Sequence, residues 1–397
     1  MNPQVVIIGH GYTSRLSIIR SVAEVGCDVT VIVTTLSDKR EKPIDCYSKY
    51  VSRFYFCGRS NSEELIQLLL NKCTDPVQKV VLIPDGDDVV ATIDTHQGQL
   101  KEHFLFPHIN HEEGAILKWM DKEKQKSLAR EVGLNVANAH IIEIVDGHYS
   151  IPKEIQYPCF PKPLATASGG KGGMRRCNNV GDLKAAIDYI IKYKNKTEKV
   201  LVEDYKEIDT EYALLGFSDG KEVMIPGILE FLTVSKQHTG IALQGKIMPV
   251  TGFEGLLNQF KQLVLKVGFV GVFDIDFYKS KGDFYFCELN MRFGGSGYAY
   301  TKMGVNFPAM LVHYFHGESV DMSKSINQTA VYVNERMCLD DWKNFALTTA
   351  EYQNYLHSAD IRFIPDDSDP GPEKVYVKEY RKQSVIRFLL RIKRSVR

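Results

Sequence analysis

The sequence lacks several features that would assign it to a class at once. Its 49 Lys and Arg residues balance 49 Asp and Glu residues, so it has no excess positive charge for binding nucleic acid. It contains no apolar run of about 18 residues, the length of a transmembrane helix, and its first residues predict a strand rather than a signal peptide. Its eight cysteines form no C-x-x-C pair, which argues against a zinc site. Several lie in apolar, strand-like runs, so we expect reduced, buried thiols in the cytoplasm.

Familiar catalytic patterns are also missing. The P-loop pattern G-x-x-x-x-G-K-[ST] does not occur, and no glycine-rich kinase loop is followed by H-R-D and D-F-G motifs. The chain does have an ordinary globular composition, with 397 residues of which 44% are hydrophobic and 25% charged. A chain of this length is typical of a protein with several domains and a large core.

The most informative segment predicts a β-hairpin with its turn at residues 280–283, where Lys-Gly-Asp supplies the turn chemistry. Because side chains alternate between faces, each arm presents polar groups on one side. These groups are Asp274 and Asp276 on the first arm, and Glu288, Asn290 and Arg292 on the second. Oxygen ligands beside a fixed guanidinium suit Mg²⁺ bound to phosphates. Taken alone, the pattern also describes a hairpin with ordinary surface charges.

A glycine-rich loop lies upstream of the hairpin, in the run Ser168-Gly169-Gly170-Lys171-Gly172-Gly173. Four glycines within five residues exclude a helix or the core of a strand. The backbone N–H groups of such a loop can point at an anion, and Lys171 adds charge at its tip. Lys162 precedes the loop at the end of an apolar run, where it could reach a phosphate. A flexible surface loop is the alternative interpretation.

A third element, residues 199–215, predicts a strand, a short polar linker and another strand. Glu203, Asp204 and Tyr205 fall at the start of the linker. A linker of this kind can offer N–H and C=O groups to an adenine edge, with a carboxylate for the amino group or the ribose. By itself the segment is equally an ordinary structural connection.

The N-terminal part predicts the start of a doubly wound parallel sheet. Its elements are an apolar strand at 5–8, a turn at Gly9-His10-Gly11, a helix at 14–25 and a second strand at 29–33. A dinucleotide site is a weak alternative, because Ser14 stands where the third glycine belongs. A further strand at 80–83 leads into the acidic loop 84–88, at the strand end where α/β sheets bind ligands. That loop either meets an amine substrate or caps a helix.

In this order and spacing, the three elements resemble those of ATP-grasp enzymes, a superfamily of carboxylate–amine ligases. Within it, the chain is most similar to the D-aspartate ligase type and the carbamoyl-phosphate-synthetase-like group. The cues are Phe104-Leu-Phe-Pro-His-Ile-Asn, then Asp121-Lys122 opening a helix, and the unbroken step from Asp274 to Glu288. The resemblance covers roughly residues 1–320.

The resemblance implies an α/β fold, with α+β character in the grasp part. The implied domains are a Rossmann-like preATP-grasp domain at 1–115, an ATP-grasp domain at 116–320 and a C-terminal extension at 321–397. Within the grasp domain it implies a small lid lobe at about 140–200 and a large lobe at 201–320.

The resemblance also implies roles for single residues. Those that would hold ATP are Lys122, Lys162, the closing loop Ser168, Gly169, Gly170, Lys171, Gly172, Gly173 and Met174, the adenine linker Glu203, Asp204 and Tyr205, and the ribose carboxylate Glu211. Those that would bind Mg²⁺ are Asp274, Glu288 and Asn290. Arg292 would stabilise the acyl-phosphate or the tetrahedral intermediate, with Lys171 as a second catalytic group. Two departures are Met291, where many relatives have proline, and Asp276, which competes with Asp274 for the metal.

The implied reaction uses ATP and two Mg²⁺ ions, with Mn²⁺ as a substitute, to convert a carboxylate to an acyl-phosphate that an amine attacks. It needs no protein nucleophile, so the absence of a Ser-His-Asp arrangement is expected. The partners are small-molecule carboxylates and amines, with no nucleic acid, and a homodimer is left open. The alternatives are a carboxylase or carbamoyl-phosphate type of enzyme, and a regulator that binds nucleotide without turnover.

Two weaker candidates lie in the grasp part. The polar segment 235–248 offers Lys236, His238 and Lys246 to a substrate carboxylate or phosphate, although a lone loop histidine usually lies on the surface. The run Gly294-Gly295-Ser296-Gly297 either binds the carboxyl substrate through its N–H groups or is a plain turn into a helix.

Beyond residue 320 the resemblance fades. The sequence predicts a strand at 329–334, a helix near 340–345 and a loop at 365–372. The apolar and basic tail from Ser384 to Arg397 suits an amphipathic helix. We expect this helix to pack on the body with a solvated basic face. Contact with an anionic membrane, a lipid-linked glycan or a protein partner is the alternative.

Overall fold

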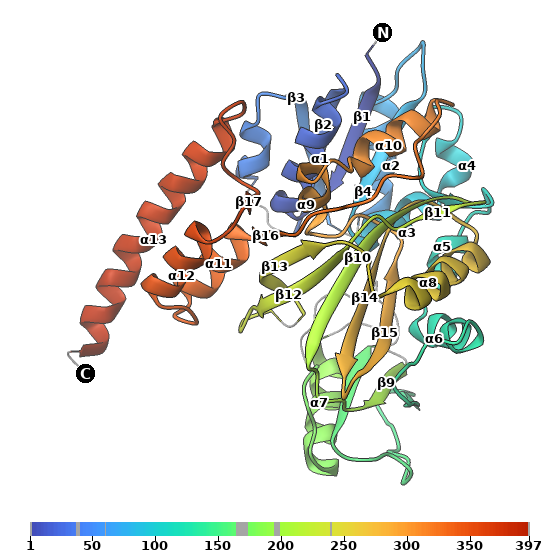
Figure 1. Cartoon of the computed structure of the whole chain (residues 1–397), viewed down its shortest axis with the longest axis vertical. Coiled ribbons are helices and arrows are strands. Elements are labelled where there is room, and N and C mark those ends of the chain that lie inside the picture. The colour runs from blue at the N-terminus through green and yellow to red at the C-terminus, as the bar shows by residue number, and fades with distance from the viewer. Residues whose placement is uncertain are drawn as a thin grey trace.

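The computed structural model describes residues 2–36, 40–59, 61–163, 174–193, 199–238 and 240–395. The predicted glycine-rich loop at 168–173 lies outside these ranges. The strands form three sheets, and Figure 1 shows the first at the top, the second in the middle and the third at the bottom. This arrangement of a parallel sheet and mixed α/β layers confirms the predicted fold class.

The first sheet is parallel throughout, in the order β3-β2-β1-β4-β5. Its strands are β1 (Gln4–Gly9), β2 (Asp28–Thr35), β3 (Val51–Gly58), β4 (Val80–Asp85) and β5 (Phe104–Leu105). Its helices are α1 (Tyr12–Ala23), the 3-10 helix η1 (Ile44–Tyr47), α2 (Ser62–Lys72), α3 (Asp87–Asp94) and α4 (Gln97–Leu100). Because the strands run the same way, the carboxyl ends of β1, β3 and β4 meet at one edge, as a ligand site requires.

The second sheet is mainly antiparallel, in the order β15-β14-β10-β12-β13-β16-β17, with β6 and β11 attached. Its strands are β6 (His108–Ile109), β10 (Thr210–Asp219), β11 (Val223–Met224), β12 (Ile228–Val234), β13 (Ala242–Met248), β14 (Phe269–Ser280), β15 (Asp283–Asn290), β16 (Ala330–Val333) and β17 (Ile361–Arg362). The β14–β15 hairpin turns at Lys281 and Gly282, both at positive φ, which confirms the hairpin predicted from the sequence.

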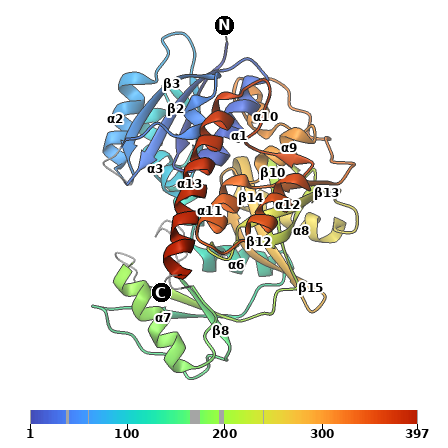
Figure 2. The same cartoon turned by 90° about the vertical axis from the view of Figure 1, so that its left-hand side faces the viewer.

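The third sheet is small and antiparallel, in the order β7-β9-β8. It consists of β7 (Ala139–Glu143), β8 (Cys159–Pro163) and β9 (Lys199–Asp204), and α7 (Val180–Tyr193) packs on it. A cluster of buried side chains that includes Ile187, Ile190 and Val200 forms its own core. This part therefore stands apart from the other two sheets in packing, as Figure 2 also shows.

The remaining helices cover and join the larger sheets. They are α5 (Ala115–Trp119), α6 (Lys122–Glu131), α8 (Glu254–Val267), α9 (Gly297–Lys302), α10 (Phe307–Phe315), α11 (Glu335–Lys343), α12 (Thr349–His357) and α13 (Gly371–Ser395). α8 buries an aromatic face of the second sheet, with Phe260 between Phe277 and Phe286. α9 and α10 lie against α1, so one apolar core spans the first and second sheets.

The C-terminal elements begin earlier than the sequence predicts. The helix expected near 340–345 starts at Glu335, where the Asn334 side chain accepts a hydrogen bond from the Met337 N–H. The loop expected to reach Pro372 ends before Gly371, and the tail helix expected from Ser384 starts there instead. Pro372 is tolerated because the first turn of a helix has no partner for its N–H group.

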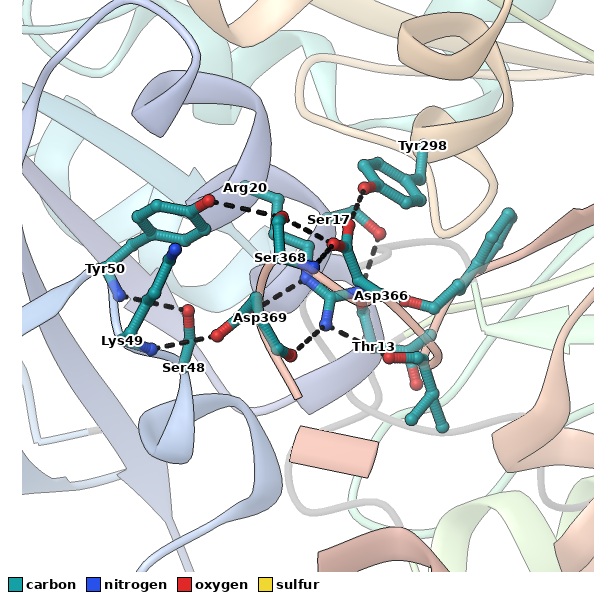
Figure 3. A network of polar contacts seen from close by, with 12 residues as sticks. Thr13, Ser17, Arg20, Ser48, Lys49, Tyr50, Tyr298, Asp366, Ser368 and Asp369 are labelled. Carbon is teal, nitrogen blue, oxygen red and sulfur yellow. Dashed lines mark hydrogen bonds and ion pairs between the residues drawn. The ribbon is translucent and has the colours of Figure 1, made fainter. Parts of the chain in front are cut away.

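Buried Arg20 of α1 ties the C-terminal segment to the first sheet (Figure 3). Its Nε lies 3.0 Å from Asp369 Oδ2, and its remaining nitrogens donate to the carbonyl oxygens of Phe363, Ile364 and Asp369. The second oxygen of Asp369 accepts from the Lys49 N–H at 2.9 Å. A buried guanidinium is stable only with such partners, so these contacts fix residues 363–369 on the N-terminal part of the chain.

We expect Arg20→Met to destabilise the protein by about 3–5 kcal/mol, because it leaves the Asp369 carboxylate buried without its cation. Urea denaturation followed by circular dichroism measures the change. Lys266→Met removes an exposed ion pair with Glu131 and should leave the transition where it is. Equal transitions for parent and Arg20→Met would contradict the assignment of this contact as a structural clamp.

Candidate active site

A cavity of about 860 Å³ lies where the three sheets approach one another. The first sheet contributes side chains from the carboxyl ends of three strands, namely His10, Arg59 and Asp85. The third sheet contributes Lys162 and Glu203, and the β14–β15 hairpin contributes Asp276, Tyr278, Cys287 and Glu288. Elements far apart in the sequence thus supply a single site.

Most of the predicted site residues that the structure describes line this cavity. They are Lys122, Lys162, Met174, Glu203, Asp204, Tyr205, Glu211, Glu288 and Arg292. Asp274 and Asn290 are described but do not belong to the lining. Ser168, Gly169, Gly170, Lys171, Gly172 and Gly173 fall outside the described ranges. The structure therefore brings together the predicted lysines, linker and arginine, and places the metal ligands differently.

Buried Gln125 holds helix α6 against β15, because its side-chain amide forms two hydrogen bonds of the kind that a neighbouring strand would form. Its Oε1 accepts from the Leu289 N–H and its Nε2 donates to the Leu289 carbonyl oxygen, both at 2.9 Å. At the start of the helix, Asp121 caps the Lys124 N–H at 2.9 Å. Lys122 and Lys126 are one helical turn apart and so face the same way, toward the site.

Two lysines share the carboxylate of Glu203. Lys126 pairs with one oxygen, and Lys162 Nζ lies 2.7 Å from the other. Burial and the neighbouring Lys162 lower the pKa of Lys126. Sequence reasoning missed Lys126, although its spacing of four residues from Lys122 in a predicted helix was a usable signal. Glu203 thus serves as the counter-ion of two lysines in this structure.

Lys122 has a carboxylate partner of its own, because its Nζ lies 2.9 Å from Glu288 Oε2. Burial opposes the charge of Lys122, but Glu288 outweighs it and raises the lysine pKa. Both lysines that were predicted to hold phosphates are therefore paired with carboxylates in the absence of a ligand.

The predicted metal site needs one correction, since Asp276 rather than Asp274 faces the cavity. Asp276 is the cross-strand neighbour of Glu288, and the Asn290 side chain lies 3.4 Å from it. Asp274 lies deeper, where a β-carbon on Gly294 would come within 2.5 Å of its Oδ2. Burial, followed by the charge of Asp276, raises the pKa of Asp274 well above its usual range. The loop after β15 covers Asp274, which sequence alternation alone does not reveal.

The described residues contain no group of three His, Cys, Asp or Glu side chains close enough to hold a metal ion. Asp276 and Glu288 nevertheless fit a Mg²⁺ ion that arrives with a nucleotide. Magnesium usually keeps several waters and takes only one or two protein carboxylates besides phosphate oxygens. The donor chemistry of this pair is therefore sufficient for Mg²⁺, provided Lys122 leaves Glu288.

The edge of the first sheet adds two more ion pairs to the cavity. Arg292 Nε lies 2.6 Å from Asp87 Oδ1, and Arg59 Nε lies 3.0 Å from Asp88 Oδ2. Burial opposes the charge of Arg292, yet Asp87 and Asp274 keep its pKa raised. The acidic loop was predicted from the sequence, whereas Arg59 was missed. The only feature that could have predicted Arg59 was its position at the end of β3. The half-buried pattern of that strand makes the position hard to recognise from the sequence.

His10 also lies at this edge, and it was not predicted as a site residue. Burial and the nearby Arg59 lower its pKa, which favours the neutral imidazole at neutral pH. Its ring is close to Gly86, where a β-carbon would come within 3.5 Å of it and where φ is 156°. The positive φ and the approach of that β-carbon to 2.9 Å from Asp88 Oδ1 favour glycine at this turn.

The linker between β9 and β10 has apolar neighbours in the cavity. Phe160, Ile208, Phe231 and Tyr278 contribute to the lining beside it. The N–H groups of Asp204 and Tyr205 are already used, because they donate to the carbonyl oxygens of Asn138 and Pro158. A nucleobase bound here would be held by apolar contact and by polar groups of the linker beyond Tyr205.

Three residues considered for substrate contact lie away from the cavity. Lys236 donates through its backbone N–H to Asp341 at 2.8 Å, and His238 lies 3.9 Å from Asp340, so both face the C-terminal part. Lys246 pairs with Glu230 at 2.7 Å, across β13 and β12. These side chains are therefore not part of the cavity lining, which agrees with the surface interpretation of His238. Of the glycine run, Gly295 lines the cavity and Gly297 begins α9.

Comparison with known proteins shows what this chain is similar to. Residues 127–307 match the family model of the ATP-grasp domain. Formate-dependent phosphoribosylglycinamide formyltransferase from Wolinella succinogenes is 23% identical over 185 residues, which are 47% of this chain and 47% of that protein. The match therefore spans about half the length of this curated relative.

Solved structures share the fold over most of the chain. The biotin carboxylase domain of Hydrogenobacter thermophilus 2-oxoglutarate carboxylase, solved with MgADP, ADP and bicarbonate, aligns with a TM-score of 0.66 and 19% identity, covering 83% of this chain and 74% of that one. L-amino acid ligase from Bacillus licheniformis aligns with a TM-score of 0.62 and 17% identity, covering 83% and 79%. These matches confirm the resemblance and the fold class predicted from the sequence.

Asp85 gives the site a pH-dependent stability. Burial raises its pKa to about 6 from 3.8, while a hydrogen bond from Ser14 at 2.6 Å acts in the opposite direction. The folded chain therefore holds this proton more tightly than the unfolded chain, and stability falls as pH rises from about 4 to about 6. At about 1.4 kcal/mol for each pH unit between the two pKa values, the whole window amounts to about 3 kcal/mol.

Asp85→Asn removes this dependence. Relative to the parent, the variant should gain stability between pH 4 and pH 7, by up to about 3 kcal/mol. Urea denaturation at several pH values measures the difference. Asp283→Asn, in the exposed hairpin turn, is the matched control and should follow the parent at every pH. A constant difference between Asp85→Asn and the parent across this range would show that Asp85 does not titrate there.

Proposed function

We propose that this chain, which carries an ATP-grasp domain, is an ATP-dependent ligase that activates a carboxylate as an acyl-phosphate and joins it to an amine. The observation that supports it most is the set of paired charges around the cavity. Lys122 and Lys162, two lysines of the kind that bind phosphates, are paired there with Glu288 and Glu203, and Asp276 lies across the strand from Glu288, so that two carboxylates of the kind that bind Mg²⁺ are adjacent. A nucleotide with its metal ion can replace these partners without leaving a buried charge alone.

The nucleotide would lie along the linker and the two lysines. Phe160, Ile208 and Tyr278 offer apolar contact to a base, and Glu211 at the start of β10 suits a ribose hydroxyl. Lys162 and Lys122 would orient the phosphates for in-line transfer. Asp276 and Glu288 would hold Mg²⁺, whose chemistry is to neutralise charge on the phosphate oxygens.

Phosphate binding requires an exchange of ion pairs. Lys162 must leave Glu203, and Lys122 must leave Glu288, before either can bind phosphate. Glu288 then becomes available to the metal ion. Glu203 keeps Lys126 as its partner, so its buried carboxylate is not left without a cation. Lys126 is a positioning residue in this scheme, because it acts only through Glu203.

The coupling step would take place between the nucleotide and the edge of the first sheet. Arg292, which lines the cavity, would stabilise the oxygen of the acyl group as the amine attacks. The amine must be neutral to attack, and neutral His10 or the carboxylate of Asp87 could receive its proton. The amine nitrogen forms the new bond to the acyl carbon, and inorganic phosphate leaves.

A carboxylase of the biotin or carbamoyl-phosphate type is the second candidate. Its support is the structural similarity to a biotin carboxylase domain solved with bicarbonate. Bicarbonate would replace the organic carboxylate in the same first step. The two candidates differ in which acid drives phosphate release.

The decisive experiment measures ADP and phosphate release from Mg-ATP with amino acids and carboxylated acceptors, added singly and in pairs. We expect turnover that needs one carboxylate and one amine, and a loss of about a hundredfold in Glu288→Ala, because charge on the phosphates is no longer neutralised. Glu131→Ala, an exposed acid on α6, should turn over like the parent. Release driven by bicarbonate alone would favour the carboxylase, and nucleotide binding without turnover would favour a regulator.

The exchange of ion pairs makes a separate prediction for nucleotide affinity. In Lys126→Met, Glu203 has only Lys162 left and holds it, so ADP should bind about tenfold more weakly in calorimetry. Adding Glu203→Gln releases Lys162, and the double variant should recover most of the lost affinity. A purely structural role for Lys126 predicts the reverse outcome, with the double variant weaker than either single one.

A further inference from the structure

Helix α13 packs on the body of the protein as expected, with Arg381 and Lys382 exposed, but one basic side chain turns inward. Arg387 is only 5% exposed, donates to the Leu347 carbonyl oxygen at 2.8 Å and stacks on the rings of Trp342 and Phe345. Two turns earlier Tyr380 packs on Trp342, and three turns earlier the Tyr376 hydroxyl lies 2.8 Å from the hydroxyl of Tyr352. The basic side chain is drawn inward because a guanidinium stacks well on aromatic rings.

The opposite face of α13 is apolar and points to solvent. Val385, Phe388 and Leu389 are 60%, 63% and 58% exposed, and their spacing puts them on one side of the helix. Ile386 and Leu390 widen this surface on its flank, and both are exposed. An uninterrupted apolar surface of this kind is unusual on a monomer and marks a place of contact.

The charges around this apolar surface have a single sign. Arg381 and Lys382 are exposed one turn before it, and from residue 380 onward the sequence has no Asp or Glu. Two copies of α13 placed face to face would bring these like charges together. The apolar surface therefore calls for an anionic partner.

We propose that the outward face of α13 docks on an anionic lipid bilayer. Apolar side chains spread over a wide arc suit acyl chains, which impose no shape, and the exposed side chains of Arg381 and Lys382 suit lipid phosphates. Figures 1 and 2 show α13 running along the outside of the molecule past α11 and α12, with its C-terminal end projecting from the body. None of the described helices has the length and hydropathy of a bilayer-spanning segment, so the helix would lie on the surface.

Flotation of the full chain with vesicles tests this docking. We expect binding to vesicles of phosphatidylcholine mixed with phosphatidylglycerol, little binding to phosphatidylcholine alone, and weaker binding at about 0.5 M than at about 0.1 M salt. The double variant Phe388→Asp with Leu389→Asp should bind at least tenfold less. Its melting temperature should match the parent, because both side chains are exposed.

Two controls separate this face from general stickiness. Val77→Asp changes an equally exposed apolar residue in another part of the chain and should bind vesicles like the parent. Arg381→Glu with Lys382→Glu should bind less while leaving the apolar face intact. Failure of the parent to float with anionic vesicles would overturn the proposal. A parent dimer that the Phe388→Asp, Leu389→Asp variant dissociates, without vesicle binding, would assign the face to a second copy instead.

Discussion

The organisation of the site follows from one constraint, that a charge taken out of water needs a partner of opposite sign. The cavity brings cations from four parts of the chain into a partly buried space, and each lies beside a carboxylate. The pairs are Lys122 with Glu288, Lys162 with Glu203, Arg292 with Asp87, and Arg59 with Asp88. Each of these cations therefore already has a partner, and a polyanion that binds one of them would take the place of a carboxylate.

This pairing also links parts of the chain that have separate cores. Glu203 belongs to the third sheet, Lys126 to α6, and Leu289 of β15 is held by Gln125 of the same helix. The third sheet has its own hydrophobic cluster, so its relation to the second sheet depends on polar contacts of this kind. An exchange of ion-pair partners at Glu203 would therefore shift the small sheet as well as change the charge of the cavity.

Local rules were enough for some of these features and not for others. The hairpin was predictable because Lys281-Gly282 supplies a turn and apolar residues fill both arms. That Asp276 rather than Asp274 faces the cavity was not predictable, since it depends on the loop that folds over Asp274 near Gly294. Arg59 was not predicted as a site residue because it reaches the site only through the parallel pairing of β2 with β3. The inward turn of Arg387 depends on Trp342 and Phe345, which no periodicity within α13 encodes.

The contact between Arg20 and Asp369 has a consequence for synthesis on the ribosome. The two residues are 349 positions apart, so at roughly 5–20 residues per second the arginine is made about 17–70 seconds before its carboxylate. During that interval the first parallel sheet can form, but the guanidinium of α1 has no buried anion to receive it and must stay hydrated. The final packing of the N-terminal part therefore waits until Asp369 has been made.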